Sequence, residues 1–198
     1  MSKVTTAALT SPFDSLSKTS AWLRGAGIVL SGSAFAALCA HLSLPLFFTP
    51  VPLSLAPFAV LMLGLALSPR MAAITFAAYL VEGAAGLPVF APSPASGGLA
   101  HLFGPTGGYL LAYPLAAVLI SFLYRRTGRG FVSAFTCAAI GDLLILCGGA
   151  IWLAALTHIA FMQATALAVL PFLAGDALKI AAAAAIRSGA ARLWRRTA

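Results

Sequence analysis

Charged residues are scarce in this sequence. Lys, Arg, Asp and Glu make up 8% of the 198 residues, and only four residues are acidic, whereas about 25% of a typical soluble domain is charged. Hydrophobic residues make up 61% of the chain. The shortage of charge excludes an ordinary soluble domain and predicts an all-α integral membrane protein. The length fits one compact helical bundle.

Sequence signatures for several kinds of chemistry are also missing. The three cysteines lie in apolar segments without Cys-x-x-Cys spacing, so they predict neither a disulfide framework nor a metal site. The histidines at 41, 101 and 158 lack metal-ligand spacing, and no nucleophile lies beside a base. We therefore expect no enzyme, cofactor or metal. There is no phosphate-binding loop for ATP hydrolysis, and residues 1–20 do not resemble a cleaved signal peptide.

Prolines, glycines and arginines divide the apolar sequence into six predicted spans. A tail at 1–20, expected to be mobile, and a basic tail at 191–198 flank a single membrane domain, residues 21–190. Residues 153–170 fit a short helix or a re-entrant piece as well as another span. The six predicted spans cover residues 22–42, 53–67, 71–87, 107–124, 131–148 and 171–187.

Basic residues gather on one predicted side of the membrane. Six spans put both termini on the same side, and all but one of the 12 Lys and Arg residues then fall on that side. The positive-inside rule therefore predicts cytoplasmic termini, and it argues against a seventh span in 153–170. The same rule accounts for the net charge of +8 without a nucleic-acid partner.

The remaining cation, Lys179, lies inside the last predicted span, three residues after Asp176. Residues at this spacing share one helix face. Lys179 is about 12 Å from Arg187 along the helix axis, which places it near the middle of the membrane. A charge at that depth costs about 2.5–3.5 kcal/mol and usually faces a protein interior or a cavity. The pair predicts either a polar ligand pocket or an ion pair that only fixes helix packing.

Two further acids fall in predicted spans. Glu82 ends the third span, and Asp142 lies in the outer half of the fifth. Glu82 fits either a binding residue or a carboxylate at the membrane interface. Asp142 fits either a functional residue or one that hydrogen-bonds between helices. In a proton-coupled carrier, both acids and Asp176 would be proton sites.

The longest break in the apolar pattern runs from residue 83 to residue 109. Glycine lets the backbone approach a ligand closely, and proline fixes turns. Because long loops in compact proteins are usually functional, this segment predicts one wall of an extracytoplasmic binding site. It contains Gly86-Leu-Pro-Val-Phe-Ala91, a Pro-rich piece at 92–96, Gly97-Gly98, and Gly104-Pro-Thr-Gly-Gly-Tyr109.

Together with Gly175-Asp176-x-x-Lys179, these motifs resemble, in this order, the BioY family. BioY proteins are the substrate-capture (S) components of energy-coupling-factor biotin transporters. The resemblance covers roughly residues 45–190. It implies a multi-pass protein of the bacterial inner membrane that binds biotin near the outer face. It also implies a membrane coupling subunit and ATPase subunits as partners. Two places depart from the family: residues 54–57 lack the Thr-Leu-Gln of relatives, and residues 92–96 are Pro-rich rather than Gly-rich.

The resemblance also implies roles for individual residues. Asp176 is expected to accept the ureido N–H groups of biotin, and Lys179 to bind either the ureido oxygen or the carboxylate. For the aromatic residues among the other contacts, packing or an interfacial belt is the alternative. A stripe of small residues in the first span resembles the face that docks on the coupling subunit, with internal packing as its alternative. The other expected contacts are Tyr109, Ser96, Gly97, Gly98, Phe90, Trp152 and Glu82, and the stripe is Gly32, Ala36 and Ala40.

Two other functions stay open at this stage. A capture component for another vitamin would share the fold and differ only in its pocket. A small ion- or proton-coupled vitamin carrier would work without a coupling module.

Overall fold

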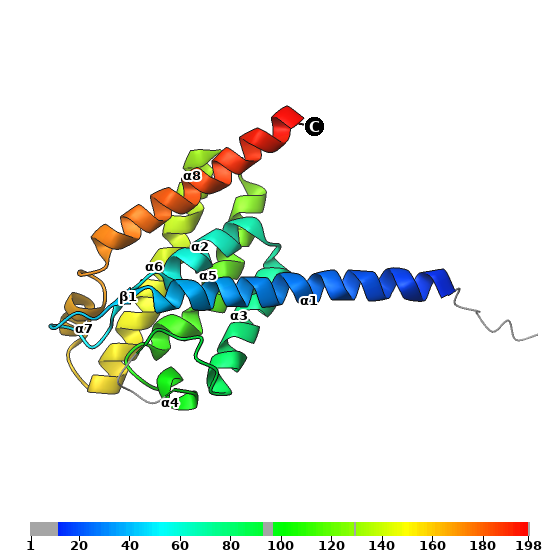
Figure 1. Ribbon diagram of the computed structural model, residues 1–198. Coiled ribbons are helices and arrows are strands. Elements are labelled where there is room, and N and C mark those ends of the chain that lie inside the picture. The colour runs from blue at the N-terminus through cyan, green and yellow to red at the C-terminus, as the bar shows by residue number, and fades with distance from the viewer. Residues whose placement is uncertain (1–11, 93–96, 129, 198) are drawn as a thin grey trace, which may run out of the picture.

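The described part of the chain is mostly helical (Figure 1). The computed structural model describes residues 12–92, 97–128 and 130–197, with side chains for 22–92, 97–128 and 130–190. Within these ranges, the strands β1 (Ser43–Leu44) and β2 (Leu53–Ser54) form one short antiparallel hairpin. Apart from this hairpin, all the elements in the described ranges are helices, so the all-α prediction is confirmed. The helices are α1 (Pro12–His41), α2 (Ala56–Ala66), α3 (Pro69–Ala84), α4 (Leu99–Leu102), α5 (Gly107–Arg126), α6 (Phe131–Thr157), α7 (Phe161–Ala168) and α8 (Leu173–Thr197).

Three of these helices are long and apolar enough to cross a membrane: residues 22–41 of α1, all of α5 and all of α6. α7 and residues 173–190 of α8 meet the same standard together, as one broken span or a re-entrant loop with a bend of 54°. α2 has 11 residues and α3 has 16, whereas crossing requires about 17–25. The described chain is therefore a membrane protein with three or four candidate spans by this standard, and the prediction of six is not confirmed.

Several helices extend beyond their predicted limits. α1 begins at Pro12, inside the predicted N-terminal tail, and the backbone of α8 is helical through most of the predicted basic tail. α6 continues through Gly148 and Gly149 to Thr157, although the glycine pair was predicted to end that span. The pair is tolerated because α5 packs closely against it. Residues 153–170 contain the end of α6 and the short α7, which matches the short-helix alternative.

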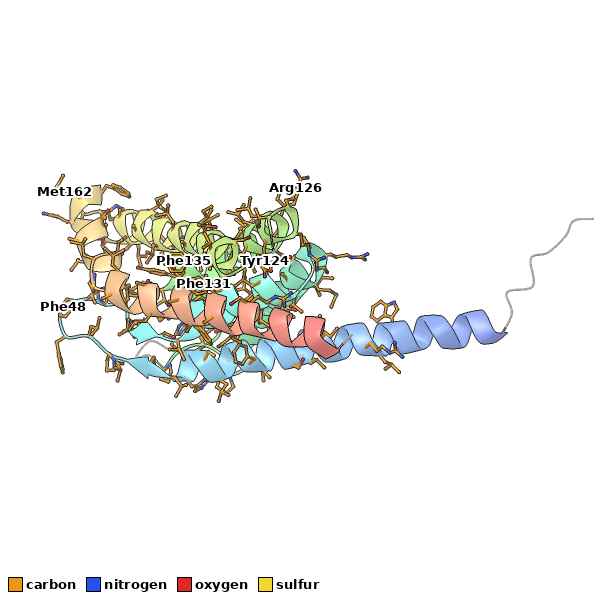
Figure 2. All side chains as sticks on the ribbon, turned by 90° about the horizontal axis from the view of Figure 1, so that it is seen from above. Phe48, Tyr124, Arg126, Phe131, Phe135 and Met162 are labelled. Atoms are coloured by element: carbon orange, nitrogen blue, oxygen red, sulfur yellow. The ribbon has the colours of Figure 1, made fainter. Side chains whose placement is uncertain are left out.

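The bundle has two ends that lie far apart in Figure 2. In Figure 2, Phe48 and Met162 lie at one end, and Arg126 lies at the opposite end. The start of α1 projects beyond the bundle at the Arg126 end, and α8 runs toward that end as well (Figures 1 and 2). Both described chain ends therefore point in the same direction.

α5 lies at the centre of the bundle and contacts α2, α3, α4 and α6. Its fully buried Ile120 packs against Gly141 of α6, where an added Cβ would lie 2.3 Å from Ile120 Cδ1. The outer surfaces of α5 and α6 instead expose large apolar side chains, including Leu115, Leu143 and Ile151. Such a surface is unfavourable in water, and it is suited to contact with lipid.

Candidate functional site

A buried ion pair lies near the beginning of α8. Lys179 Nζ donates to Asp176 Oδ1 at 2.8 Å, and the two residues are 8% and 3% exposed. Asp176 is in the first turn of its helix, where the helix dipole favours a negative charge. The two residues lie on the same face, as their spacing predicted. Because both charges are removed from water, each one must be stabilised by the other or by a ligand.

The ion pair lines a cavity formed by α1, α3, α4, α5, α6, α8 and the segment from Val51 into α2, with Ala40 as the contribution of α1. Most of its wall is apolar, with a few polar groups among the apolar ones, which is the usual composition of a small-molecule site. Apolar lining residues include Val51, Pro52, Leu110, Ile145, Leu146 and Phe172. The polar lining residues are Ser54, Tyr79, His101, Thr106, Tyr109, Tyr113, Asp142, Asp176 and Lys179.

Tyr109 lines this cavity, at the start of α5. Its hydroxyl donates to the backbone oxygen of Ala168 at 2.6 Å, which connects α5 to the end of α7. Its ring meets the Phe172 ring edge to face, with centroids 6.3 Å apart. These contacts fix the orientation of the ring, so that Tyr109 presents a rigid wall to the cavity.

Phe90 is buried beside the cavity and is not among its lining residues. Its ring lies between Tyr79 and His101, with centroid distances of 5.3 Å and 5.1 Å. Position 83 must be glycine for this arrangement, because an added Cβ there would lie 2.0 Å from the Phe90 ring. Phe90 thus supports two residues that do line the cavity. Its expected direct contact with the ligand stays a prediction.

His101 lies in α4, outside the candidate spans, and is 5% exposed. Burial lowers the pKa of its imidazole, because a charged ring would lose its hydration. Within the described part of the chain, its Nε2 has no hydrogen-bond partner. The ring therefore offers a neutral polar group to the cavity.

Trp152 holds the turn that precedes α5. Its Nε1 donates to the Gly104 oxygen at 2.9 Å, and its side chain covers Gly108, where an added Cβ would lie 2.2 Å from Trp152 Cβ. This close packing explains Gly108, and an added Cβ at Gly107 would lie 1.9 Å from the Leu102 oxygen. Trp152 does not line the cavity, so the structure places it in support of the wall.

Glu82, Gly97 and Gly98 are not among the residues that line the cavity. Glu82 is half-buried and accepts a hydrogen bond from Ser33 Oγ, which connects α3 to α1. Gly97 is exposed, and Gly98 precedes α4 with a positive φ of 75°, a conformation that favours glycine. Ser96 lies outside the described residues.

The small-residue stripe of α1 faces the interior of the bundle. Ala36 and Ala40 are each 1% exposed, and a Cβ added to Gly32 would lie 2.7 Å from Thr75 Cγ2 on α3. In this structure the stripe packs inside the bundle, with Gly32 against α3 and Ala40 in the cavity wall. Its expected role in docking stays a prediction. Docking through them would require α1 to separate from α3.

Several lining residues were not predicted as site residues. Tyr79 and Tyr113 are aromatic residues within apolar helices, and nothing in the local sequence separates them from core residues. Asp142 did carry a signal, since an acid within an apolar span is rare. In the structure it is 4% exposed and lines the cavity. Among the described residues, no group of three or more His, Cys, Asp or Glu could hold a metal ion.

Comparisons with known proteins agree on one family. The BioY family model matches residues 11–196. The chain is 42% identical over 137 residues to the probable biotin transporter BioY of Pyrococcus horikoshii, covering 69% of this chain and 78% of that protein. It is 36% identical over 156 residues to the probable biotin transporter BioY of Bacillus subtilis, covering 76% and 82%.

A solved structure matches the fold closely. It is a crystal structure of the S-component for biotin from an ECF-type ABC transporter, with a TM-score of 0.78 and 26% identity. The match covers 87% of this chain and 93% of that chain. The likeness therefore extends over most of both chains.

Proposed function

Because the chain belongs to the BioY family, we propose that it binds biotin in the cavity around Asp176 and Lys179 and passes it on for uptake. The observation that carries this proposal is the buried ion pair in a mostly apolar cavity. Its relatives are named biotin transporters, and the similar solved structure is described as the S-component for biotin.

The chemistry of biotin fits this cavity. Its fused rings are apolar apart from a urea group, which has two N–H donors and one strong oxygen acceptor. The Asp176 carboxylate can accept from an N–H group, and the Lys179 ammonium can donate to an oxygen. Apolar residues such as Ile145 and Phe172 surround the pair and can cover the thioether ring. The buried charges strengthen these hydrogen bonds, because little water competes with them.

The proposal includes a place in the membrane and a set of partners. We propose that the protein lies in a bacterial inner membrane with six passes and both termini in the cytoplasm. The path of the chain supports this, since the loop at Phe48 and helix α7 lie at the end opposite Arg126 (Figure 2). The resemblance to S components supports a coupling subunit and ATPase subunits as partners, with ATP hydrolysis left to those subunits.

Binding by the purified full-length protein tests the proposed ligand. Calorimetric titration with biotin, thiamine and riboflavin should give micromolar or tighter affinity for biotin alone. Preferential binding of thiamine or riboflavin would instead identify a capture component for another vitamin. No binding of biotin at micromolar concentration would contradict the proposal.

Uptake by cells tests the proposed partners. Biotin uptake should require coexpression of the coupling subunit and ATPase subunits and should persist when the proton gradient is dissipated. Uptake by the chain alone that stops with loss of the gradient would favour the ion-coupled carrier.

A further inference from the structure

Asp142 is a buried acid that has no function yet in the site described above. It lies in the middle of α6, is 4% exposed, and lines the same cavity as Asp176 and Lys179. Within the described ranges, its Oδ1 has no hydrogen-bond partner. A buried carboxyl oxygen without a partner is destabilising. A ligand that supplies an N–H group to this oxygen would remove that cost.

Asp142 interacts electrostatically with both Asp176 and Lys179, so the three charged groups lie together at one end of the cavity. They favour one kind of ligand group. Lys179 is already paired with Asp176 at 2.8 Å, and Asp142 adds a second acid without adding a cation. A carboxylate placed here would meet two acids and one ammonium group, with net repulsion. A urea instead offers two N–H donors and one acceptor oxygen. That count matches two carboxylates and one ammonium group.

The opposite end of the cavity has different chemistry. Asp142 follows Gly141, which packs against α5 at Ala116 and Ile120. His101 lies in α4, just before the turn that begins α5 at Gly107. On α5, Ala116 marks the level of Asp142 and Gly107 marks the level of α4. These two residues are nine positions apart, which is about 14 Å along the helix axis. The His101 imidazole and the Thr106 hydroxyl line that second end, and no acid is among the lining residues there.

We propose that Asp142 is a third polar contact for biotin and accepts one of the two ureido N–H groups. Asp176 accepts the other, Lys179 donates to the ureido oxygen, and the ligand carboxylate points toward α4. This assignment rests on the proposed function. It also decides between the two partners that the sequence left open for Lys179.

The test compares Asp142→Leu and Asp142→Asn with wild type. Both are titrated with biotin and with biotin methyl ester, which lacks the carboxylate charge, and the ligand-free unfolding temperature is measured. Leu143→Asn is the control, because Leu143 is the next residue and is 60% exposed. We expect Asp142→Leu to lose about 10- to 100-fold in affinity for biotin and for the ester alike, from the loss of one hydrogen bond to a charged group. The ligand-free unfolding temperature should stay the same or rise.

The ester also tests the orientation. Wild type should bind it within about tenfold of biotin, and Leu143→Asn should behave like wild type. A loss of more than about 100-fold for the ester in wild type would place the carboxylate at Lys179 and overturn the proposal.

Two further results would overturn the role of Asp142. One is biotin affinity in Asp142→Leu within about threefold of wild type. The other is a lower unfolding temperature with unchanged affinity in Asp142→Asn, which would make Asp142 a packing residue. If Asp142→Leu does not fold, Asp142→Asn decides, and a reduced affinity in that variant supports the proposal. Failure of wild type to bind biotin would be a different result, because it removes the proposed function as well.

Discussion

The ring of Tyr109 occupies the space that a side chain at position 149 would need. A Cβ added to Gly149 would lie 2.1 Å from Tyr109 Cζ. α5 and α6 are therefore close enough at this level for the Tyr109 ring to pack directly on the α6 backbone. The glycine in α6 and the cavity wall formed by Tyr109 depend on each other.

Gly149→Ala should therefore destabilise the protein and weaken biotin binding. The added methyl group must displace the Tyr109 ring or α6, and overpacking of this kind costs about 1–3 kcal/mol. We expect a lower unfolding temperature and a weaker biotin affinity, measured by thermal unfolding in detergent and by calorimetry. The matched control is Gly189→Ala in α8, where no atom lies within 4 Å of the added Cβ. The control should be neutral or slightly stabilising, because Ala is the better helix former. Equal effects of the two changes would contradict the role given to the Tyr109–Gly149 contact.

Ala36→Trp should disrupt the bundle itself. Ala36 is 1% exposed, so an indole ring cannot fit between α1 and its neighbours without separating them. We expect little folded protein in size-exclusion chromatography and no biotin binding. Ala34→Trp is the control, since Ala34 is exposed on the same helix, and it should fold and bind normally. Normal binding by Ala36→Trp would instead mean that the small-residue stripe is free to dock a partner.

Stability should fall as the pH drops below about 6.5, in part because of His101. Burial lowers the pKa of this imidazole in the folded protein, while in the unfolded chain it is about 6.5. Below that pH the unfolded chain takes up a proton that folded His101 does not, so unfolding becomes easier. The decline stops once the pH is below the folded pKa. The measurement is the difference in unfolding temperature between pH 7.5 and pH 5.5, which should shrink in His101→Gln. An unchanged difference in that variant would show that His101 does not contribute.

The parts of this protein that the sequence predicted are those with strong local signals. Asp176 and Lys179 stand out because charges are rare in apolar spans, and their spacing alone places them on one helix face. Tyr79 and Tyr113 gave no such signal, because an aromatic residue in an apolar helix reads the same whether it faces a cavity or a neighbour. Only the fold brings them to the cavity.

The close packing of one helix backbone on another was the other feature that could not be predicted from the sequence. Gly148 and Gly149 were interpreted as the end of a span, although α6 continues through them. The glycines serve contact with α5, and that contact involves residues about 40 positions earlier in the chain. The small-residue stripe of α1 was ambiguous for the same reason, since its partner α3 is distant in sequence.

The central claim is that the Asp176–Lys179 pair binds biotin, and calorimetric titration of Asp176→Asn with biotin tests it most directly. The variant keeps the shape of the side chain but removes its charge and leaves Lys179 without its partner at 2.8 Å. Leu178→Asn is the control, because Leu178 is 73% exposed between the two residues. We predict that Asp176→Asn weakens biotin binding by about 100-fold or more, the usual scale for breaking a buried charge pair, while Leu178→Asn binds like wild type. Affinity of Asp176→Asn equal to that of wild type would contradict the account.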